Sequence, residues 1–169
     1  MTTFDFGNGR VPAHQHSNGG GWVADTATVS ESVFVGREAM VYGNAVVSGS
    51  DYAQVKGNAL VSGNARVYGN AVVTDNAKVT GNAKVYGNAR VSDYAWVSSN
   101  AWVSGNARVS DNAVVSGNAW VSGYAEVSGN AEVTGNAEVT GNAEVYDNAR
   151  VSGKVSGNDV VSGDAMTLW

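Results

Sequence analysis

From Trp22 onward, apolar and polar positions alternate in a six-residue period that reads A-x-V-x-G-N. Valine returns at every sixth position from 23 to 47 and from 55 to 151, and again at 155 and 161. An alanine precedes most of these valines by two residues; the exceptions at that position are Gly21, Val33, Gly153 and Asp159. Because alternate residues of a strand share a face, the pattern predicts short strands with alanine and valine inside and the x residues outside. A helix is excluded because its period of about 3.6 residues does not match.

The two residues that follow each predicted strand are usually Gly-Asn or Asp-Asn. Glycine and asparagine both tolerate the positive φ that a sharp corner requires, so we expect a corner there. Matching outward residues recur 18 positions apart, as Tyr68 and Tyr86 do, which indicates three six-residue sides per coil. The prediction is an all-β, single-stranded parallel β-helix: a three-sided prism of about eight coils, roughly 35–40 Å long at about 4.8 Å per coil.

The repeat divides the chain into three parts. Residues 1–21 are not repetitive, and we expect Phe4, Phe6 and Val11 to cap the first coil, because open strand edges invite aggregation. Residues 22–166 form the repeat, interrupted by a two-residue insertion around Ser50 and Asp51 and by a later two-residue deletion. Residues 167–169 form the C-terminal end. We expect Met166, Leu168 and Trp169 to plug it, and Asp159, in an alanine position, to point inward.

The segment Val67-Tyr68-Gly69-Asn70-Ala71-Val72 resembles the hexapeptide repeat of left-handed parallel β-helix proteins. The left hand is implied by this resemblance alone, because parallel crossovers are normally right-handed. The segment Asn18-Gly19-Gly20-Gly21-Trp22-Val23 is similar to that of uncharacterised phage and prophage hexapeptide-repeat proteins. The resemblance implies a phage or prophage origin.

Composition narrows the possible environments and partners. The chain has no cysteine, no apolar stretch long enough to span a membrane, and no recognisable signal peptide, so we expect a cytoplasmic protein, in the host cytoplasm if it is phage encoded. A net charge of −5 argues against an overall positive electrostatic field that would attract nucleic acid. Lys78, Lys84 and Arg90 surround one coil instead of lining one face, so nucleic-acid binding is not expected.

His14 and His16 are the only histidines. On an extended segment they share a face, so they are candidate metal ligands; the alternative is a polar role in the cap, and otherwise we expect no cofactor. Many proteins with this repeat are acyl-CoA-dependent acyltransferases that use a histidine as general base. This chain departs from them because residues 17–169 contain no histidine and no long loop interrupts the coils. Catalysis is therefore the alternative to a non-enzymatic role.

The outward residues before each valine suggest how the chain self-associates. The fourth coil has a basic residue on all three sides and the seventh has a glutamate on all three. Between these coils lie three tryptophans and Val114, which predicts an interface. On one side Lys84, Trp102, Trp120 and Glu138 read as a self-complementary series, and a second side repeats it with Lys78, Trp96, Val114 and Glu132. We expect a homo-oligomer, an antiparallel dimer or a parallel trimer, with a monomer as the alternative. The predicted function is a non-enzymatic structural or binding module; the alternatives are an acyltransferase relative and a virion fibre component.

Overall fold

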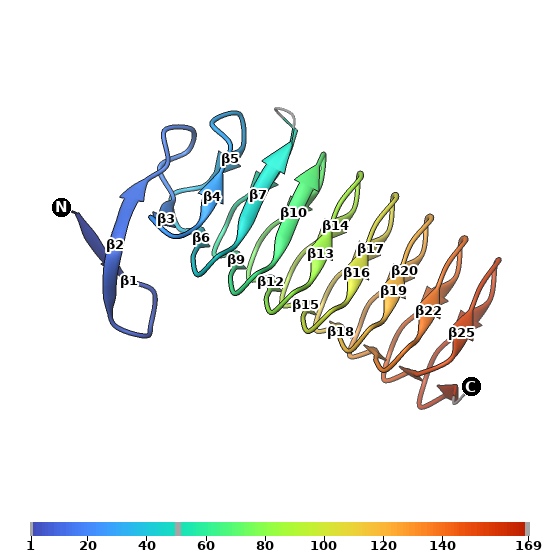
Figure 1. Cartoon of the computed structure of the whole chain (residues 1–169). Coiled ribbons are helices and arrows are strands. Elements are labelled where there is room, and N and C mark those ends of the chain that lie inside the picture. The colour runs from blue at the N-terminus through green and yellow to red at the C-terminus, as the bar shows by residue number, and fades with distance from the viewer. Residues whose placement is uncertain (1, 50–51, 168–169) are drawn as a thin grey trace.

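The computed structural model describes residues 2–49 and 52–167. It is a rod of stacked coils with a β-hairpin at its N-terminal end (Figure 1). Each coil contributes one short strand to each of three sheets, which we call side 1, side 2 and side 3. Within the described residues the chain forms strands, turns and bends, and no helix.

Strands of successive coils that pair in one sheet are three elements apart in the chain, because the chain visits the three sides in turn. In order of pairing, side 1 contains β1 (Thr3–Asp5), β2 (Arg10–Gln15), β3 (Trp22–Ala24), β6 (Met40–Val41), β9 (Leu60–Val61), β12 (Lys78–Val79), β15 (Trp96–Val97), β18 (Val114–Val115), β21 (Glu132–Val133), β24 (Arg150–Val151) and β27 (Met166–Thr167). Side 2 contains β4 (Thr28–Val29), β7 (Val46–Gly49), β10 (Arg66–Gly69), β13 (Lys84–Val85), β16 (Trp102–Val103), β19 (Trp120–Val121), β22 (Glu138–Val139) and β25 (Lys154–Val155). Side 3 contains β5 (Phe34–Val35), β8 (Gln54–Val55), β11 (Val72–Val73), β14 (Arg90–Val91), β17 (Arg108–Val109), β20 (Glu126–Val127), β23 (Glu144–Val145) and β26 (Val160–Val161).

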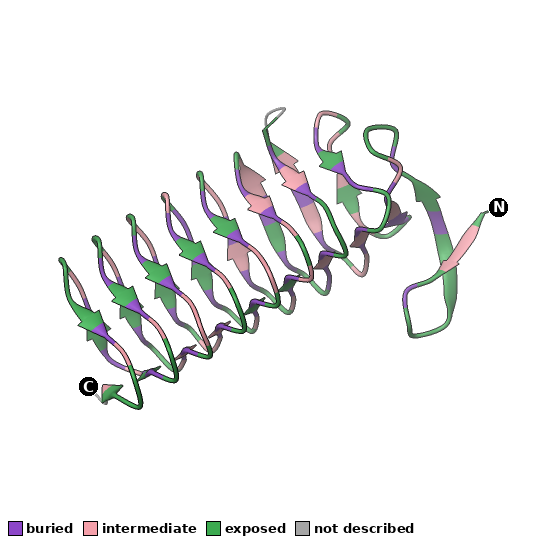
Figure 2. Ribbon diagram, turned by 180° about the vertical axis from the view of Figure 1, so that it is seen from behind, coloured by how far each residue is buried: buried purple, intermediate pink, exposed green. Residues whose placement is uncertain are grey.

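The coils stack so that equivalent residues pair in parallel. Val67 pairs with Val85, and Val85 pairs with Val103, each 18 residues further along the chain. The inward alanines and valines between Val33 and Val155 are at most 2% exposed, and they form the buried bands in Figure 2. Each buried valine contributes roughly 1.5–3 kcal/mol before chain entropy is subtracted. The predicted inward columns are confirmed, and the architecture is a parallel β-solenoid of about eight turns, consistent with a left-handed β-helix.

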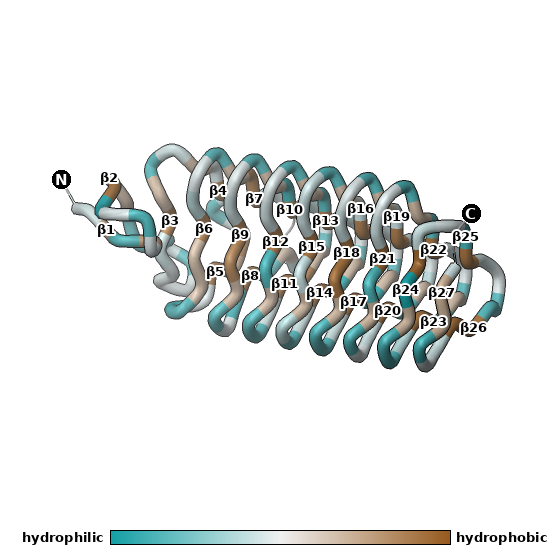
Figure 3. Tube along the Cα trace, turned by 90° about the horizontal axis from the view of Figure 1, so that it is seen from below, coloured by the Kyte–Doolittle hydropathy of each residue, from teal (hydrophilic) through white to brown (hydrophobic). Residues whose placement is uncertain are grey.

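The corners are polar (Figure 3). Glycine and asparagine were both expected to allow positive φ there, but the two corner residues have different roles. Positive φ occurs at the first corner residue, for example Gly87 and Asp93, and at no asparagine of the described chain. The asparagine instead donates a side-chain hydrogen bond to the asparagine one coil further on. Asn64, Asn82 and Asn100 are linked in this way at 3.1 Å. One left-handed residue is enough to turn the chain, and coil stacking brings equivalent amides within hydrogen-bonding distance, as in other asparagine ladders.

Aspartate replaces glycine at several left-handed corner positions and gains a hydrogen bond there. The Asp111 Oδ2 accepts from the Gly129 backbone N–H at 3.0 Å, and the Asp147 Oδ2 accepts from the Gly163 N–H at 3.1 Å. The carboxylate therefore satisfies a backbone donor of the neighbouring coil, which offsets the strain of a side chain at positive φ.

The N-terminal segment covers strand edges instead of plugging the core. β1 and β2 form an antiparallel hairpin, and β2 pairs antiparallel with β3 of the first coil. On side 3, the Val35 N–H donates to the Asn18 carbonyl and the Gly21 N–H donates to the Val35 carbonyl. Of the three residues expected to cap the coil, Phe4 and Phe6 pack against Trp22 and Tyr42 in a separate small cluster, and Val11 is exposed.

At the other end, the expectations for the last coil differ from the structure. Met166 is 55% exposed, because it occupies the outward position of β27, so it does not plug the core. Asp159 is exposed, and its Oδ2 accepts a hydrogen bond from the Ser156 N–H, because no coil covers this edge among the described residues. Leu168 and Trp169, like Ser50 and Asp51 of the insertion, lie outside the described residues.

Candidate functional site

Side 2 carries a row of aromatic side chains in contact with one another, of which the two tryptophans are exposed and the two tyrosines are half-buried. Tyr68 stacks on Tyr86 with ring centroids 4.9 Å apart. Tyr86 then meets Trp102 edge-to-face at 6.3 Å, and Trp102 meets Trp120 in the same way at 6.3 Å. We call these four residues the aromatic ribbon. Such edge-to-face and stacked pairs are each worth roughly 0.5–1.5 kcal/mol beyond burial.

The register of the repeat and a side-chain hydrogen bond hold the tryptophans of the ribbon in place. Trp102 and Trp120 are direct register partners on adjacent strands, and they remain 39% and 43% exposed. The Trp120 indole N–H donates to Ser104 Oγ at 3.3 Å, which orients the ring. Partial burial raises the pKa of the Tyr68 hydroxyl, and the neighbouring Tyr86 adds to the rise. Tyr68 therefore stays protonated at neutral pH and adds no charge to the surface.

Opposite charges lie at the two ends of the tryptophan pair. The Lys84 ammonium sits 4.2 Å from the centroid of the Trp102 ring, a cation–π contact. Glu138 is the register partner of Trp120 on the other side, and it also pairs with Lys154 at 3.8 Å. The order Lys84, Trp102, Trp120, Glu138 thus follows β13, β16, β19 and β22 along one face.

Side 1 has the second predicted series but a weaker cluster. Lys78, Trp96, Val114 and Glu132 are successive register partners. Trp96 is 46% exposed and donates from its indole N–H to Thr80 Oγ1 at 2.9 Å. Glu132 pairs with Arg150 at 3.6 Å. Trp96 lies on a different sheet from Trp102 and Trp120 and makes no ring contact with them, so the structure brings together two of the three predicted tryptophans.

The two histidines engage different partners. The His14 Nδ1 lies 2.9 Å from Asp25 Oδ1, and both side chains are about half exposed. His16 is buried, and its Nδ1 accepts from the Asn18 backbone N–H at 3.2 Å. His14 lies within β2 and His16 follows its end, and the two rings have different surroundings. Among the described residues no group of three or more histidine, cysteine, aspartate or glutamate side chains could hold a metal ion.

Several surface aromatic residues were not singled out from the sequence as site residues. Tyr68 and Tyr86 extend the ribbon from the position after valine, whereas the predicted interface consists of residues before valine. Tyr52, Tyr94 and Tyr124 are each about two-thirds exposed, and they stand where the repeat normally has asparagine. Their signal was in the sequence, because three tyrosines interrupt otherwise regular asparagine columns.

Comparisons with known proteins identify the repeat. A family model described as YdcK Beta solenoid repeat matches residues 65–81, 83–99, 101–117 and 107–123. The middle coils therefore carry a known β-solenoid repeat, and the resemblance to hexapeptide-repeat β-helix proteins is confirmed at the level of repeat and fold. No curated protein matches the chain.

Among solved structures, the chain is similar to the UDP-N-acetylglucosamine acyltransferase from Campylobacter jejuni, with 13% identity and a TM-score of 0.31. The alignment covers 76% of this chain and 66% of the enzyme, so this chain spans slightly less than two thirds of that protein. No helix in residues 2–49 and 52–167 is long and apolar enough to cross a membrane.

Proposed function

We propose that this hexapeptide-repeat β-solenoid is a non-catalytic structural and binding module that self-associates as an antiparallel dimer through side 2. The observation that supports this is the exposed tryptophan pair of the aromatic ribbon, with Lys84 at one end of the pair and Glu138 at the other. The motif between Asn18 and Val23 favours a phage or prophage origin, and the module would then act in the host cytoplasm.

A two-fold axis between β16 and β19 makes the face self-complementary. Trp102 then meets the Trp120 of the second copy, Lys84 meets Glu138, and each contact forms twice. Arg66 and Lys154 also meet at the ends of the overlap, so charge alone cannot provide the affinity. Exposed ion pairs contribute about 0–1 kcal/mol. The tryptophans supply the desolvated centre, and the ion pairs select the antiparallel register.

The assembly is tested by replacing the tryptophan pair. We expect wild-type protein to have a dimeric mass by light scattering and the double variant Trp102→Ser with Trp120→Ser to be monomeric, because the desolvated centre is lost. Trp96→Ser is the matched control, since it removes an equally exposed tryptophan from side 1, and it should remain dimeric. A trimeric wild type, or a dimer that survives the double substitution, contradicts the proposal.

A charge exchange tests the antiparallel register. Lys84→Glu places two glutamates opposite each other in the antiparallel dimer and should weaken it. Adding Glu138→Lys to the same chain restores opposite charges across the interface and should recover part of the affinity. In a parallel arrangement each residue meets its own equivalent, so the second substitution would bring no recovery.

Acyl transfer is the second candidate, and the His14–Asp25 pair is the observation that favours it. An acidic partner holds an imidazole in one orientation, as a general base requires. Beside this pair, Phe6, Tyr42 and the hairpin enclose a hollow of about 460 Å³ lined also by Asp25. However, the pair is about half exposed to water, so it is not enclosed as an active-site base usually is.

We therefore expect no acetyl transfer from acetyl-CoA to sugar or amine acceptors, measured as release of free CoA. The comparison of His14→Ala with His16→Ala makes the assay specific, because only His14 faces solvent and Asp25. Turnover in the wild type that disappears in His14→Ala and persists in His16→Ala would establish the enzyme and displace the non-catalytic proposal.

A further inference from the structure

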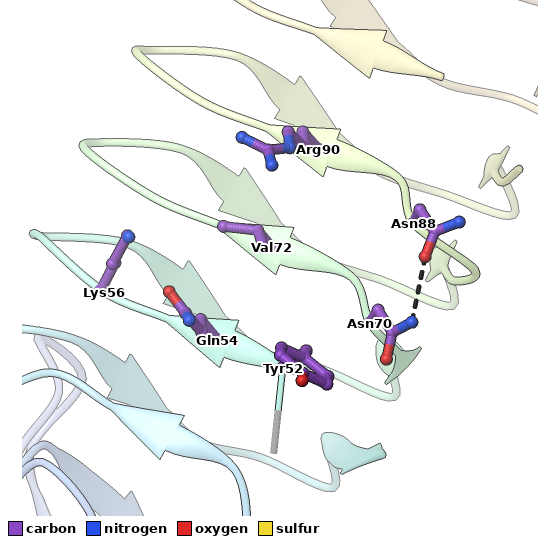
Figure 4. A pocket seen from close by; sticks show the side chains of 7 residues that line it. All are labelled: Tyr52, Gln54, Lys56, Asn70, Val72, Asn88 and Arg90. Carbon is purple, nitrogen blue, oxygen red and sulfur yellow. Dashed lines mark hydrogen bonds between the residues drawn. The ribbon is translucent and has the colours of Figure 1, made fainter. Parts of the chain in front are cut away.

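A groove on side 3, separate from the aromatic ribbon, has the features of a ligand site. One hollow of about 610 Å³ is lined by Tyr52, Lys56, Val72 and Arg90, among others (Figure 4). A second hollow of about 330 Å³ continues along the same side to Tyr124. The two share Asn88 and Arg90, so they adjoin along side 3, and we call them together the groove.

The groove exists because of side-chain lengths in one column. Gln54, Val72 and Arg90 are register partners on β8, β11 and β14. The short Val72 lies between two longer side chains and leaves a depression, and Tyr52 stands at its edge in Figure 4.

The charges in this groove favour an anion. Lys56 and Arg90 are exposed, and neither takes part in an ion pair with any described residue. The nearest cation further along, Arg108, is already paired with Glu126 at 3.4 Å. Two unpaired cations two coils apart therefore make the part of the groove near Tyr52 its positively charged end, which favours an anionic group of a ligand.

One edge of the groove carries a column of asparagines whose side chains form hydrogen bonds with one another. Asn88 accepts from the Asn70 side chain at 3.0 Å and donates to the Asn106 side chain at 3.1 Å. A carboxamide has two N–H donors and two acceptor lone pairs. The ladder uses one of each on Asn88, so one donor and one acceptor remain to face a ligand. Asn106 continues the ladder one coil further on, about 4.8 Å along the rod.

Aromatic rings lie at both ends of this asparagine column. Tyr52 and Tyr124 occupy the same corner column as the three asparagines, and they are 70% and 66% exposed. They are four coils apart, about 19 Å at the coil spacing. Exposed tyrosines present an apolar ring face and a polar hydroxyl. This length accommodates a short chain of rings and exceeds a single one.

We propose that side 3 binds an acidic oligosaccharide, with its carboxylates beside Lys56 and Arg90 and its sugar faces against Tyr52 and Tyr124. Hydroxyl groups are both donors and acceptors, which matches the donor and the acceptor that remain on Asn88. Directly linked sugars advance by about one coil spacing, whereas a phosphodiester link would lengthen the repeat.

The test uses the full chain and a tetramer of galacturonic acid, with binding measured by isothermal titration calorimetry. We expect Lys56→Ala and Arg90→Ala each to weaken binding about tenfold, equivalent to roughly 1.4 kcal/mol. Tyr52→Ala and Tyr124→Ala should each weaken it severalfold. The fully methyl-esterified tetramer, which has the same rings without the charges, should bind about tenfold or more weakly than the acid.

Two matched variants control for general effects of charge and ring removal. Lys78→Ala removes an exposed lysine from side 1, and Tyr94→Ala removes an equally exposed tyrosine from another corner, so neither should change the affinity. The proposal is overturned if the acid does not bind, if the ester binds equally well, or if the control variants weaken binding as much. Tighter binding of single-stranded DNA through the same residues would also overturn it. Because side 3 is not part of the dimer face, the double tryptophan variant should bind the tetramer normally.

Discussion

Val103→Asp is expected to lower the free energy of unfolding by at least about 4 kcal/mol, because it places a carboxylate in a fully apolar column. Val103 has no exposed surface, and its register partners on both sides are valines, Val85 and Val121. Urea unfolding followed by circular dichroism measures the effect. In a repeat stack each coil contacts only its neighbours, so the substitution weakens two coil interfaces at once.

Two further valine substitutions serve as controls, one at an outward position and one in the last coil. Val114→Asp introduces the same side chain at an outward, half-buried position of a middle coil and should change stability by less than about 1 kcal/mol. Val161 lies inward in β26, which pairs only with β23 among the described residues, so Val161→Asp should have an intermediate effect. If Val103→Asp unfolds at the same urea concentration as Val114→Asp, the inward assignment of the valine column is wrong.

The columns could be predicted from the sequence because a strand alternates with a period of two and the valines almost never change phase. Once the 18-residue coil is assumed, the register of Lys84, Trp102, Trp120 and Glu138 follows without further information. The structure confirms that these residues are successive register partners. The asparagine ladder could have been predicted by the same step. It was missed because asparagine was considered only for its own backbone conformation, and its position above an identical residue was not considered.

Other features depend on information that periodicity does not contain. The cation–π contact of Lys84 with Trp102 and the pairing of Glu138 with Lys154 depend on side-chain rotamers. The hairpin of β1 and β2 comes from a segment with no repeat, so no register could place Phe4 against Trp22. The groove on side 3 depends on differences of side-chain length between neighbouring coils, which an analysis of shared pattern overlooks.

The corner glycines provide the second large effect, and adjacent coils allow its causes to be separated. Gly117 and Gly135 lie in the same corner column with φ of +70° and +65°. A Cβ on Gly117 would lie 2.7 Å from the Gly135 carbonyl oxygen, whereas a Cβ on Gly135 meets nothing within 4 Å. The difference arises because the two-residue deletion near Gly153 removes the corner that would otherwise cover Gly135.

Gly117→Val should therefore destabilise more than Gly135→Val. Both place a β-branched residue in the left-handed region, which costs roughly 1–2 kcal/mol for an ordinary side chain and more for a branched one. Only Gly117→Val also forces apart the backbones of two coils, and we expect a total loss of about 3 kcal/mol or more. Equal losses for the two variants, measured by urea unfolding, would show that backbone strain alone explains the corner glycines.

Gly117→Asp completes the series, because aspartate already occupies this kind of position elsewhere in the molecule. Asp111 adopts φ of 56° and accepts a hydrogen bond from the Gly129 N–H of the next coil. An aspartate at 117 can make the same bond to the Gly135 N–H, and this gain of about 0.5–1.5 kcal/mol opposes the strain. Both substitutions add a Cβ against the Gly135 carbonyl, and only aspartate gains the hydrogen bond. We therefore expect Gly117→Asp to be less destabilised than Gly117→Val at neutral pH and to lose that advantage at a pH where the carboxylate is protonated. If it is as unstable as Gly117→Val at neutral pH, the carboxylate bond does not compensate for positive φ, and the natural aspartate corners need another explanation.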